Sequence, residues 1–412
     1  MTAQRRAPRT IRVGLNTRPY DVVVGADLLP TLGRRILESL AHDAPARSHL
    51  PRRAFVIADA NLPREIVATA IASLTEAGYL TTGETVAATE QNKSIAAAER
   101  LLLSLARTRH ERTDPVIALG GGVTGDLAGF VASIYRRGVP VIQCPTTLLA
   151  MVDAAVGGKT AVNLHLPATD GTEPRLLKNL VGSFHQPSLV LCDARLLASL
   201  PDHHFRAGLA ECIKHALLGA DWREPDLLDW TTANLPSILD RTEAHLIELI
   251  ARNLAVKAAV VAADEREDGD CPGGGRLALN MGHTIAHAIE TLPIPHLGRS
   301  LLHGEAVALG LIAEAACGER LGATARGTAD RITGLVRAAG LPASMPELPS
   351  SEEILAGMLH DKKTAGGRLR LALPTGDGRC RIVFDPPEEA IRAGIDRIRG
   401  EPDATSSLAP PR

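Results

Sequence analysis

The chain has 412 residues, which is more than one ordinary compact core uses and suits two domains. Apolar residues make up 45% and charged residues 22%, a balance that excludes wholesale disorder. The 45 Lys and Arg against 47 Asp and Glu give a net charge of −2, which excludes a global field that attracts nucleic acid or an anionic membrane. An aromatic content of 2% also disfavours a platform that stacks bases.

The longest apolar stretches fall short of the roughly 20 residues that a bilayer span needs, and no apolar segment follows the basic N-terminus. The six cysteines include no CxxC pair, so neither a thiolate metal site nor a disulfide framework is indicated. These features predict a cytoplasmic protein with reduced, buried thiols.

The first half of the chain alternates between strand and helix patterns. Two short strands are predicted at Ile11–Asn16 and Asp21–Val24, followed by an amphipathic helix near Leu28–Leu40 and a polar surface insertion at Ala41–Arg53. Further apolar runs predict strands at Ala54–Ala58, Pro115–Leu119, Val139–Cys144 and Leu189–Cys192. Helical segments between most of them favour a mostly parallel sheet covered by helices.

From about Pro201 onward, helical periodicity dominates. The clearest helical segments are Ile238–Asp264, Leu277–Leu292 and Gly304–Leu321, and a late extended pair is predicted at Leu369–Pro374 and Cys380–Phe384. The last residues are rich in Pro, Ser and Ala, which is typical of disorder. We therefore expect a flexible N-terminus at 1–10, an α/β domain at 11–199, a helical domain at 200–398 and a disordered tail at 399–412.

A glycine-rich turn follows the buried run Pro115–Leu119 and leads into a helix. Its residues, Gly120-Gly-Gly-Val-Thr-Gly125-Asp126, would let a phosphate approach the backbone and the N–H groups of the next helix. The turn satisfies G-x-G-x-x-G, but no acidic residue lies near position 140 to hold a ribose, so it is not an ordinary dinucleotide fingerprint. A purely structural tight turn is the alternative interpretation.

Two other places are candidates for binding an adenosine. Asp59 and Asn61 lie at the carboxyl end of a predicted strand, where open α/β sheets bind ligands, and Glu90-Gln-Asn-Lys93-Ser94 opens a predicted helix. A simple helix cap or loop group is the alternative for each. Gly157-Gly-Lys-Thr160 imitates the end of a Walker loop, but Asp153 stands where the first glycine is required, which rejects an NTPase.

A candidate metal site combines three motifs. His283 and His287 lie four residues apart, on one face of a predicted helix, but the Glu of H-E-x-x-H is absent. His303-Gly-Glu305 adds an imidazole, and Ala210-Glu-Cys-Ile-Lys214 adds a carboxylate. Two imidazoles and one carboxylate form the open, three-ligand arrangement of catalytic zinc, whereas a core histidine satisfied by hydrogen bonds is the alternative for each histidine.

Several cations have no obvious ion-pair partner in the sequence. If they face the metal together, they form a pocket for a small polyanion that carries phosphate and carboxylate; a solvated surface is the alternative for each. These cations are Lys159, Lys178, Lys214, Lys257, Arg276 and Lys362.

The order of the motifs resembles 3-dehydroquinate synthase, a member of the sugar-phosphate cyclase superfamily, over roughly residues 11–395. The motifs that carry the resemblance are Gly120–Gly129, Arg137-Gly138, Pro145–Leu149, Val152-Asp153, Gly157–Thr160, Lys178-Asn179, Gly208–Lys214, Asn280–Glu290, His303–Ala308 and Asp361–Lys363. The resemblance implies an N-terminal NAD-binding α/β domain with a mostly parallel sheet and a mostly α-helical C-terminal metal-binding domain. It also implies a homodimer with the active site between the domains.

The resemblance further implies roles for individual residues. Zinc or cobalt would be bound by Glu211, His283 and His303, and Arg137 would reach the site of the other subunit. The implied substrate-pocket residues are Asp153, Lys159, Asn179, Lys214, Lys257, Arg276, Asn280, His287 and Lys362. The implied NAD contacts are Asp59, Asn61, Glu90, Lys93, Gly121, Gly122, Asp126, Thr146, Thr147, Lys159 and Lys178.

The implied substrate is 3-deoxy-D-arabino-heptulosonate 7-phosphate, and the implied product is 3-dehydroquinate, of the shikimate pathway. NAD would transiently oxidise the C5 alcohol and so acidify the C6 hydrogen; phosphate leaves, NADH returns the hydride, and the opened enol closes by an intramolecular aldol step. The metal would hold the C4 and C5 hydroxyls as a Lewis acid and template. The anionic ends of the substrate would be held by Lys159, Asn179, Arg276 and Lys362, with His287 as a hydrogen-bonding group rather than a ligand.

Some features depart from the family pattern. Leu166–Arg175 enlarges the loop between Asn163 and Lys178 and would alter a lid, and Asp270–Gly275 enlarges the loop before Arg276. In the helix that carries the histidines, Ala replaces a usual glycine at position 286.

Three other classes of protein are the alternatives. A 2-epi-5-epi-valiolone or 2-deoxy-scyllo-inosose synthase would share the NAD, metal and fold but take a substrate without the carboxylate. A glycerol-dehydrogenase-like oxidoreductase would release NADH, and a non-catalytic protein of this fold would lose metal ligands. The carboxylate-binding set favours the synthase with the carboxylate substrate; that set is Arg276, Asn280, His287 and Lys362.

Overall fold

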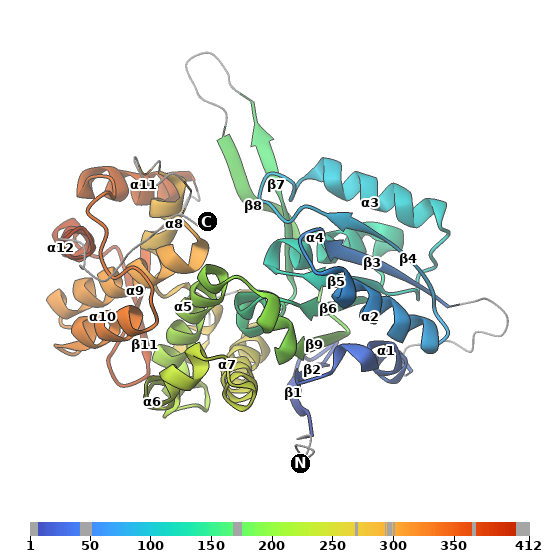
Figure 1. Ribbon diagram of the computed structural model, residues 1–412. Coiled ribbons are helices and arrows are strands. Elements are labelled where there is room, and N and C mark those ends of the chain that lie inside the picture. The colour runs from blue at the N-terminus through green and yellow to red at the C-terminus, as the bar shows by residue number, and fades with distance from the viewer. Residues whose placement is uncertain are drawn as a thin grey trace. The chain divides into compact units, whose positions relative to one another are not determined.

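The computed structural model describes residues 7–41, 52–167, 175–267, 271–292, 294, 299, 301–364 and 368–400. The chain forms two compact units, Met1–Leu200 with Leu246–Ala258, and Pro201–His245 with Ala259–Arg412 (Figure 1). The sequence analysis assigned all of 200–398 to one domain, whereas the middle of helix α7 (Glu243–Ala263) groups with the first unit. Two ion pairs connect this segment to the rest of that unit, namely Glu248 with Arg9 and Lys257 with Asp153.

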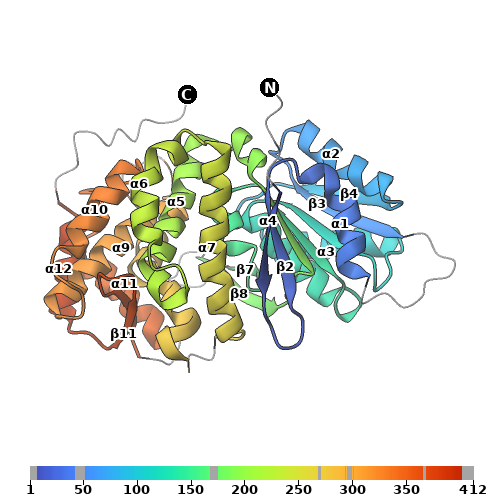
Figure 2. The same ribbon diagram turned by 90° about the horizontal axis from the view of Figure 1, so that it is seen from below.

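The first unit is built on a seven-stranded sheet with the order β1-β2-β9-β6-β5-β3-β4. All neighbouring strands are parallel except β1 and β2, which form the antiparallel hairpin seen in Figure 2. Strands β5, β6 and β9 are buried at every residue, which is why their sequences are continuous apolar runs. The predicted mostly parallel sheet is confirmed. Its strands are β1 (Arg9–Val13), β2 (Tyr20–Gly25), β3 (Arg53–Asp59), β4 (Leu80–Val86), β5 (Val116–Gly120), β6 (Val141–Pro145) and β9 (Leu189–Asp193).

Helices cover both faces of this sheet (Figure 1). Helices α1 (Leu32–Leu40) and α2 (Arg64–Glu76) pack on one face, and α3 (Ile95–Arg107) and α4 (Gly122–Ile134) pack on the other. The core beneath α3 and α4 is aliphatic apart from Phe55, Phe130 and Tyr135, in line with the low aromatic content. Short helical turns connect the layers at η1 (Leu29–Thr31), η2 (Tyr135–Arg137), η3 (Ala150–Ala154) and η4 (Ala194–Ser199).

Three strands of the first unit were not predicted. Strand β4 carries Thr, Gly and Glu and lies at the edge of the sheet, so it lacks the apolar run of its neighbours. Strands β7 (Lys159–Leu166) and β8 (Arg175–Phe184) form a separate antiparallel hairpin (Figure 1). The ends of the enlarged loop pair with each other, Leu166 with Arg175, so the insertion lengthens this hairpin; residues 168–174 lie outside the described part.

The second unit is mostly helical, as predicted, and the late extended pair is confirmed as antiparallel strands β10 (Arg370–Pro374) and β11 (Cys380–Phe384). The predicted helix at Ile238–Asp264 is wrong as one element, because α6 ends at Leu239 and the turn before α7 places Arg241 in the left-handed region (φ 53°). The predicted helix at Leu277–Leu292 is likewise split by Gly282 (φ 78°). The helices are α5 (Asp202–Leu218), α6 (Leu227–Leu239), α8 (His283–Thr291), α9 (His303–Arg320), α10 (Thr328–Ala338), α11 (Ser351–Thr364) and α12 (Glu388–Ile398), with turns η5 (Gly219–Trp222) and η6 (Pro272–Asn280).

Helix α9 is the centre of the second unit, buried along most of its length and packed against α5, α8, α10 and α12. Two of its glycines permit close backbone approach. A β-carbon at Gly304 would overlap the carbonyl oxygen of Ala207 on α5, and one at Gly310 would overlap the carbonyl oxygen of Gly282, directly before α8. The absence of these two side chains therefore sets how closely α5 and α8 approach α9.

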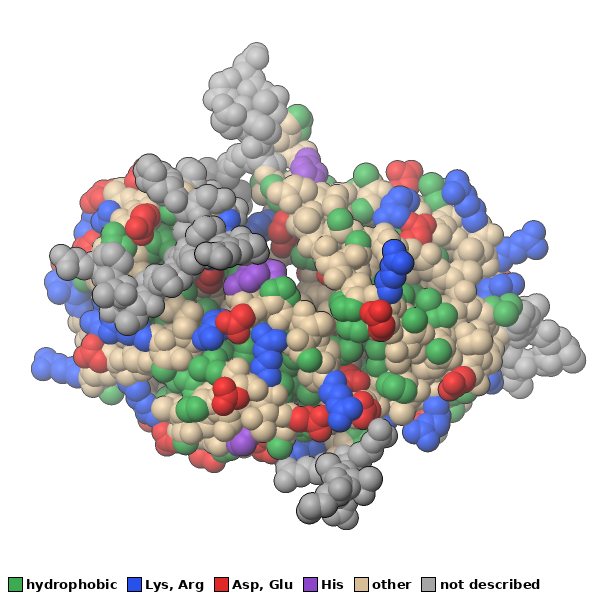
Figure 3. Space-filling view, viewed as in Figure 1, with side chains coloured by type: hydrophobic (Ala, Val, Ile, Leu, Met, Phe, Trp, Pro, Cys, Tyr) green, Lys and Arg blue, Asp and Glu red, His purple; other side chains and the backbone are tan. Residues whose placement is uncertain are grey.

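The surface carries charges of both signs. Acidic and basic side chains are interspersed on each unit over the face seen in Figure 3, in line with the small net charge. Among the helices that the structure describes, none combines the length and apolarity needed to cross a membrane.

The close approach at Gly310 can be tested by adding one methyl group. Alanine normally stabilises a helix relative to glycine by about 1 kcal/mol, but at position 310 the methyl collides with backbone. We expect Gly310→Ala to lower the free energy of unfolding by about 1–3 kcal/mol, measured by urea denaturation. Gly334→Ala is the control, because nothing lies within 4 Å of the added methyl on α10, and it should raise stability by about 0.4–1 kcal/mol. Similar gains in both variants would contradict the close packing.

Candidate active site

The carboxyl ends of β3 and β5 form a candidate ligand-binding edge in the first unit. The chain runs from β3 outward to β4 and then returns to β5, so the strand order reverses between β3 and β5, where open α/β sheets bind ligands. Asp59 ends β3, and its Oδ1 accepts hydrogen bonds from the backbone N–H (3.0 Å) and the side-chain amide (3.2 Å) of Asn61. The two predicted adenosine residues are therefore in contact with each other at the expected edge.

The glycine turn lies on the neighbouring strand, as predicted. Gly121 is the N-cap of α4 and supplies no capping side chain, so the first turn of the helix presents its N–H groups as an anion site. The methyl of Thr147 lies 3.1 Å from where a β-carbon on Gly121 would stand, and the N–H of Thr146 donates to Gly120 (2.9 Å). The structure thus brings Gly121 together with both threonines, and Gly122 begins α4 beside them.

Two later glycines of the same motif serve helix packing. A β-carbon on Gly125 would stand 2.8 Å from Oε1 of Gln143, and one on Gly129 would press into the side chain of Thr160. These contacts place α4 directly against β6 and β7. The structural interpretation therefore accounts for Gly125 and Gly129, whereas the turn itself keeps the geometry of a phosphate site.

Five polar side chains form one network in the first unit. The buried ammonium of Lys93 donates to Asp126 Oδ2 (2.5 Å) and to Asn179 Oδ1. Asn163 donates through Nδ2 to Glu90 Oε2 (2.6 Å), and its Oδ1 accepts from the backbone N–H of Asn179 (2.9 Å). Burial raises the pKa of Asp126, and the adjacent Lys93 ammonium opposes that rise. Four predicted site residues are therefore held as one unit.

The fifth member, Asn163, was not predicted as a site residue. It is fully buried, it lies at an irregularity in the pairing of β7 with β8, and it holds Asn179 in a left-handed backbone conformation (φ 58°). Asn163 lies on strand β7, which was not predicted, and the surrounding sequence does not indicate that this residue is buried or that it binds other segments. A buried amide that bonds to two neighbouring segments acts as a positioning group.

The remaining predicted residues of the first unit fall into two groups. Lys257 donates to Asp153 Oδ1, so this buried ammonium and carboxylate compensate each other's charge. Lys159 begins β7, Lys178 lies on β8, and Arg137 lies in η2, and all three are exposed. All residues assigned to NAD thus belong to the first unit.

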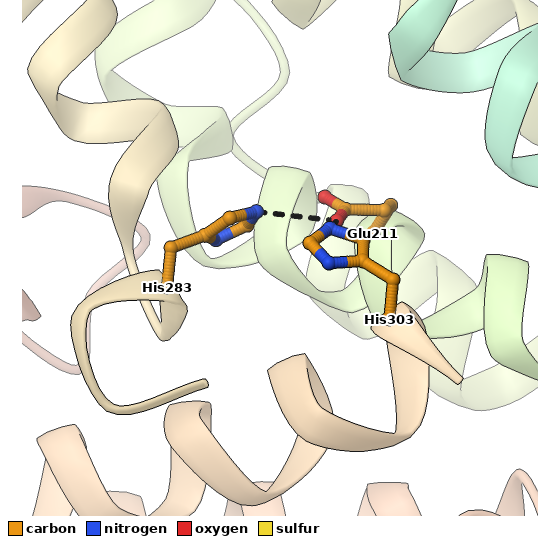
Figure 4. Close-up of side chains that lie close together, drawn as sticks. All are labelled: Glu211, His283 and His303. Atoms are coloured by element: carbon orange, nitrogen blue, oxygen red, sulfur yellow. Dashed lines mark ion pairs between the residues drawn. The ribbon is translucent and has the colours of Figure 1, made fainter. Parts of the chain in front are cut away.

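The three predicted metal ligands converge in the second unit from three different helices (Figure 4). Glu211 lies on α5, His283 begins α8 and His303 begins α9, and one ligand atom from each lies within 4.8 Å of the others. The Nε2 atoms of His283 and His303 lie 3.5 and 3.3 Å from the same oxygen, Glu211 Oε1. Two imidazoles and a carboxylate that meet at one point fit a divalent cation such as zinc.

The tautomers of both imidazoles suit a metal. His283 Nδ1 lies 3.0 Å from the carbonyl oxygen of Met281, and His303 Nδ1 lies 2.9 Å from Glu290 Oε1. Carbonyl and carboxylate oxygens accept hydrogen bonds, so Nδ1 carries a proton in each ring and Nε2 is the nitrogen that a cation would bind. Both Nε2 atoms face Glu211 Oε1, as in a ligand set.

The charges around Glu211 are strongly coupled. Burial alone would raise the pKa of Glu211, but Lys214, 2.5 Å from Oε2, and the two imidazoles hold this pKa well below its ordinary value. Burial would lower the pKa of His303, but hydrogen bonds to Glu211 and Glu290 outweigh it and raise the pKa to about 10. Without a cation, the carboxylates of Glu211 and Glu290 thus favour the protonated form of His303.

Helix α8 is held at its first turn by a buried carboxylate. Glu314 on α9 accepts hydrogen bonds from the backbone N–H groups of Gly282 (2.6 Å) and Ile285 (3.4 Å). Burial raises the pKa of Glu314 to about 8, against the opposing effect of these N–H groups. The contact fixes the backbone on both sides of His283.

The predicted substrate groups of the second unit lie on several elements. Arg276 is fully buried; its backbone N–H donates to Asp264 Oδ2 (3.0 Å) and its Nε donates to the carbonyl oxygen of Asp264 (2.8 Å). Asn280 ends η6, and His287 is exposed on α8 with its ring centre 5.6 Å from that of His283. Lys362 belongs to α11, and its side chain lies outside the described residues.

Sequence reasoning missed Glu290, Glu314 and Asp264 as site-supporting residues, although two of them left a signal. Glu290 stands seven residues after His283, which is two helical turns and the same face. Glu314 is a single acid within an apolar stretch of α9, and a charge in such a stretch requires a partner. Asp264 contacts Arg276 only because the glycine loop folds back, which the sequence did not indicate.

Comparison with known proteins places these features in one family. The model described as "3-dehydroquinate synthase N-terminal" matches residues 84–207, and the model described as "3-dehydroquinate synthase C-terminal" matches residues 208–364. A 3-dehydroquinate synthase from Symbiobacterium thermophilum is 39% identical over 388 residues, which are 93% of this chain and 99% of the relative.

Solved structures of two related cyclases share the fold. The 2-epi-5-epi-valiolone synthase of Streptomyces hygroscopicus subsp. jinggangensis, with NAD+ and Zn2+ bound, is 26% identical with a TM-score of 0.74, and the match covers 93% of this chain and 98% of that one. A 2-deoxy-scyllo-inosose synthase, complexed with carbaglucose-6-phosphate, NAD+ and Co2+, is 24% identical with a TM-score of 0.71 and coverages of 94% and 99%. At that identity the second match supports the fold alone.

Replacement of Glu211 tests the ligand set. Glu211→Gln keeps the size of the side chain but removes the charge. Loss of a residue that only hydrogen-bonds a metal ligand lowers metal affinity by roughly 10–100-fold, so we expect the loss of a ligand to lower zinc affinity by more than that. Metal content after dialysis against a zinc buffer measures the effect. Glu319→Gln is the control, since Glu319 accepts from the backbone N–H of Ala329 (2.8 Å) and is not part of the cluster. Normal zinc content in Glu211→Gln would refute the assignment.

Proposed function

The chain belongs to the 3-dehydroquinate synthase family, and from this premise we propose that it converts 3-deoxy-D-arabino-heptulosonate 7-phosphate to 3-dehydroquinate and phosphate. The observation that carries the proposal is the convergence of Glu211, His283 and His303 in a family whose other motifs are present in order. The enzyme is then a carbon–oxygen lyase that depends on NAD and a divalent metal.

The described residues fit both cofactors. When bound, zinc or cobalt supplies Lewis-acid chemistry at the substrate hydroxyls, and NAD supplies a reversible hydride acceptor. Glu211, His283 and His303 hold the cation with one oxygen and two nitrogens. The first turn of α4 donates N–H groups to the pyrophosphate, and Asp59 accepts from the ribose.

The polar network of the first unit is proposed to contact NAD. Lys93 lies between Asp126 and Asn179, so two hydrogen bonds fix the position of its ammonium. Lys159, Asn179, Arg276 and Lys362 are proposed to hold the phosphate and carboxylate of the substrate. His287 is proposed as a hydrogen-bonding group beside the reacting oxygens, since its ring is near His283 but outside the ligand cluster.

The carboxylate of the substrate separates this proposal from the neighbouring cyclases. Arg276 is fully buried; its backbone N–H donates to the Asp264 carboxylate and its guanidinium Nε donates to the Asp264 carbonyl oxygen, so both parts of the residue are positioned. A guanidinium presents paired N–H donors that match the two oxygens of a carboxylate, so Arg276 suits a substrate that carries one. The position of Arg276 therefore supports a substrate that carries a carboxylate over a sugar phosphate that lacks one.

A comparison of two substrates tests the proposal. With NAD and zinc present, the heptulosonate phosphate should release phosphate and form dehydroquinate, whereas sedoheptulose 7-phosphate should yield no carbocycle. Phosphate release and product mass spectrometry measure the two outcomes. The reverse preference would assign the chain to a neighbouring cyclase activity, and net NADH release would favour a dehydrogenase.

A cytoplasmic homodimer in which Arg137 serves the partner's site is a further part of the proposal. Arg137 is exposed at the end of η2, with a left-handed backbone (φ 66°), so its side chain is accessible to a partner. We expect Arg137→Ala to be inactive but partly rescued when mixed with Glu211→Gln, because one site of each mixed dimer is then complete. Random mixing restores roughly one quarter of parent activity. Without recovery on mixing, Arg137 acts within its own subunit.

A further inference from the structure

We propose that Glu290 is a positioning residue for the metal centre, which fixes the tautomer and orientation of His303 so that Nε2 faces the cation. This inference rests on the proposed metal-dependent function, and it adds a residue to which the ligand assignment gives no role. Glu290 would touch neither the metal nor the substrate, and it would act through the imidazole alone.

The geometry of Glu290 is that of an outer partner of a metal ligand. It lies in the last turn of α8, two helical turns after His283, and its side chain is 10% exposed. Its Oε1 lies 2.9 Å from His303 Nδ1, while His303 Nε2 lies 3.3 Å from Glu211 Oε1. The imidazole is thus held between two carboxylates, one on each ring nitrogen.

This arrangement determines which nitrogen can bind a metal. Glu290 accepts from Nδ1, so a cation that replaces the Nε2 proton would leave the ring with its proton on Nδ1 and its lone pair on Nε2. Such outer carboxylates orient the ring and make the other nitrogen a stronger ligand. Without Glu290, the tautomer protonated on Nε2 becomes competitive, and that tautomer cannot bind the metal through the nitrogen that faces Glu211.

His303 has a greater need of such a partner than His283. The partner of His283 is the carbonyl oxygen of Met281, a neutral backbone group two residues earlier in the same segment. His303 is the first residue of α9 and only half-buried, so packing restrains its ring less. A charge-assisted hydrogen bond from another helix supplies the restraint that packing does not.

The experiment measures metal binding directly, without turnover. Glu290→Gln keeps an accepting oxygen but lacks the charge, and its amide N–H can donate and so favour the other tautomer; Glu290→Ala removes the partner. Competition with a chromophoric chelator gives the zinc dissociation constant. We expect zinc affinity to fall by about 10–100-fold in Glu290→Ala and by less in Glu290→Gln.

Two controls separate positioning from general damage. The absorption spectrum of bound Co2+ should change in Glu290→Gln, because the orientation and donor strength of one ligand change, whereas Glu319→Gln should keep both the parent spectrum and the parent affinity. Urea denaturation of the metal-free variants measures the structural role of Glu290. If Glu290→Ala does not fold, Glu290→Gln supplies both readouts.

The outcomes distinguish this inference from the proposed function. Parent affinity and an unchanged Co2+ spectrum in Glu290→Gln and Glu290→Ala overturn the inference while the parent protein still binds zinc. Loss of stability with unchanged metal affinity also overturns it, because the role is then structural. Failure of the parent chain to bind one zinc per subunit instead refutes the metal-dependent function on which the inference rests.

Discussion

The metal cluster depends on how closely three backbones approach one another. The proposed ligands belong to α5, α8 and α9, so the distances between these helices determine whether their side chains reach a common point. Gly304 has no side chain, so α9 lies close to α5 at that point. Gly310 likewise allows α9 to lie close to the turn before α8. Tight packing of the second unit is therefore a condition of its chemistry.

The same region contains more charge than an apolar core tolerates without compensation. Glu211 and Lys214 are both fully buried, and each would be strongly unfavourable alone. Glu290 adds a further carboxylate on an imidazole, and Glu314 adds a buried carboxyl group that accepts from the backbone N–H of Gly282, directly before α8. Each buried charge has a specific partner, so the region is rigid because moving any group leaves another uncompensated.

The sequence predicted the architecture, and it predicted the three side chains that converge in the second unit, more fully than the supporting contacts. Buried parallel strands such as β5 and β9 are continuous apolar runs, and the glycine turn after β5 is a local pattern, so both were predictable. The edge strand β4 carries no such run, and the break at Gly282 interrupts a segment whose apolar periodicity continues. Periodicity reports which face is buried, but it does not report where the backbone turns.

The supporting residues escaped prediction for a related reason. Asn163 and Asp264 act through contacts between segments that are distant in sequence, and nothing near them in the chain marks those contacts. Glu290 lies in the motif Asn280–Glu290, but its partner His303 lies on the next helix, so only the structure shows their contact. Resemblance to a family assigned the ligands, whereas geometry assigned the residues that hold them.

The ion pair between Lys214 and Glu211 limits the denticity of the carboxylate. Because the ammonium lies against Oε2 while both imidazole Nε2 atoms face Oε1, Glu211 would offer a metal one donor atom, Oε1. A site with three protein donors would leave room for an oxygen of the substrate. Lys214, which is not among the proposed ligands, would thereby help to keep the site accessible.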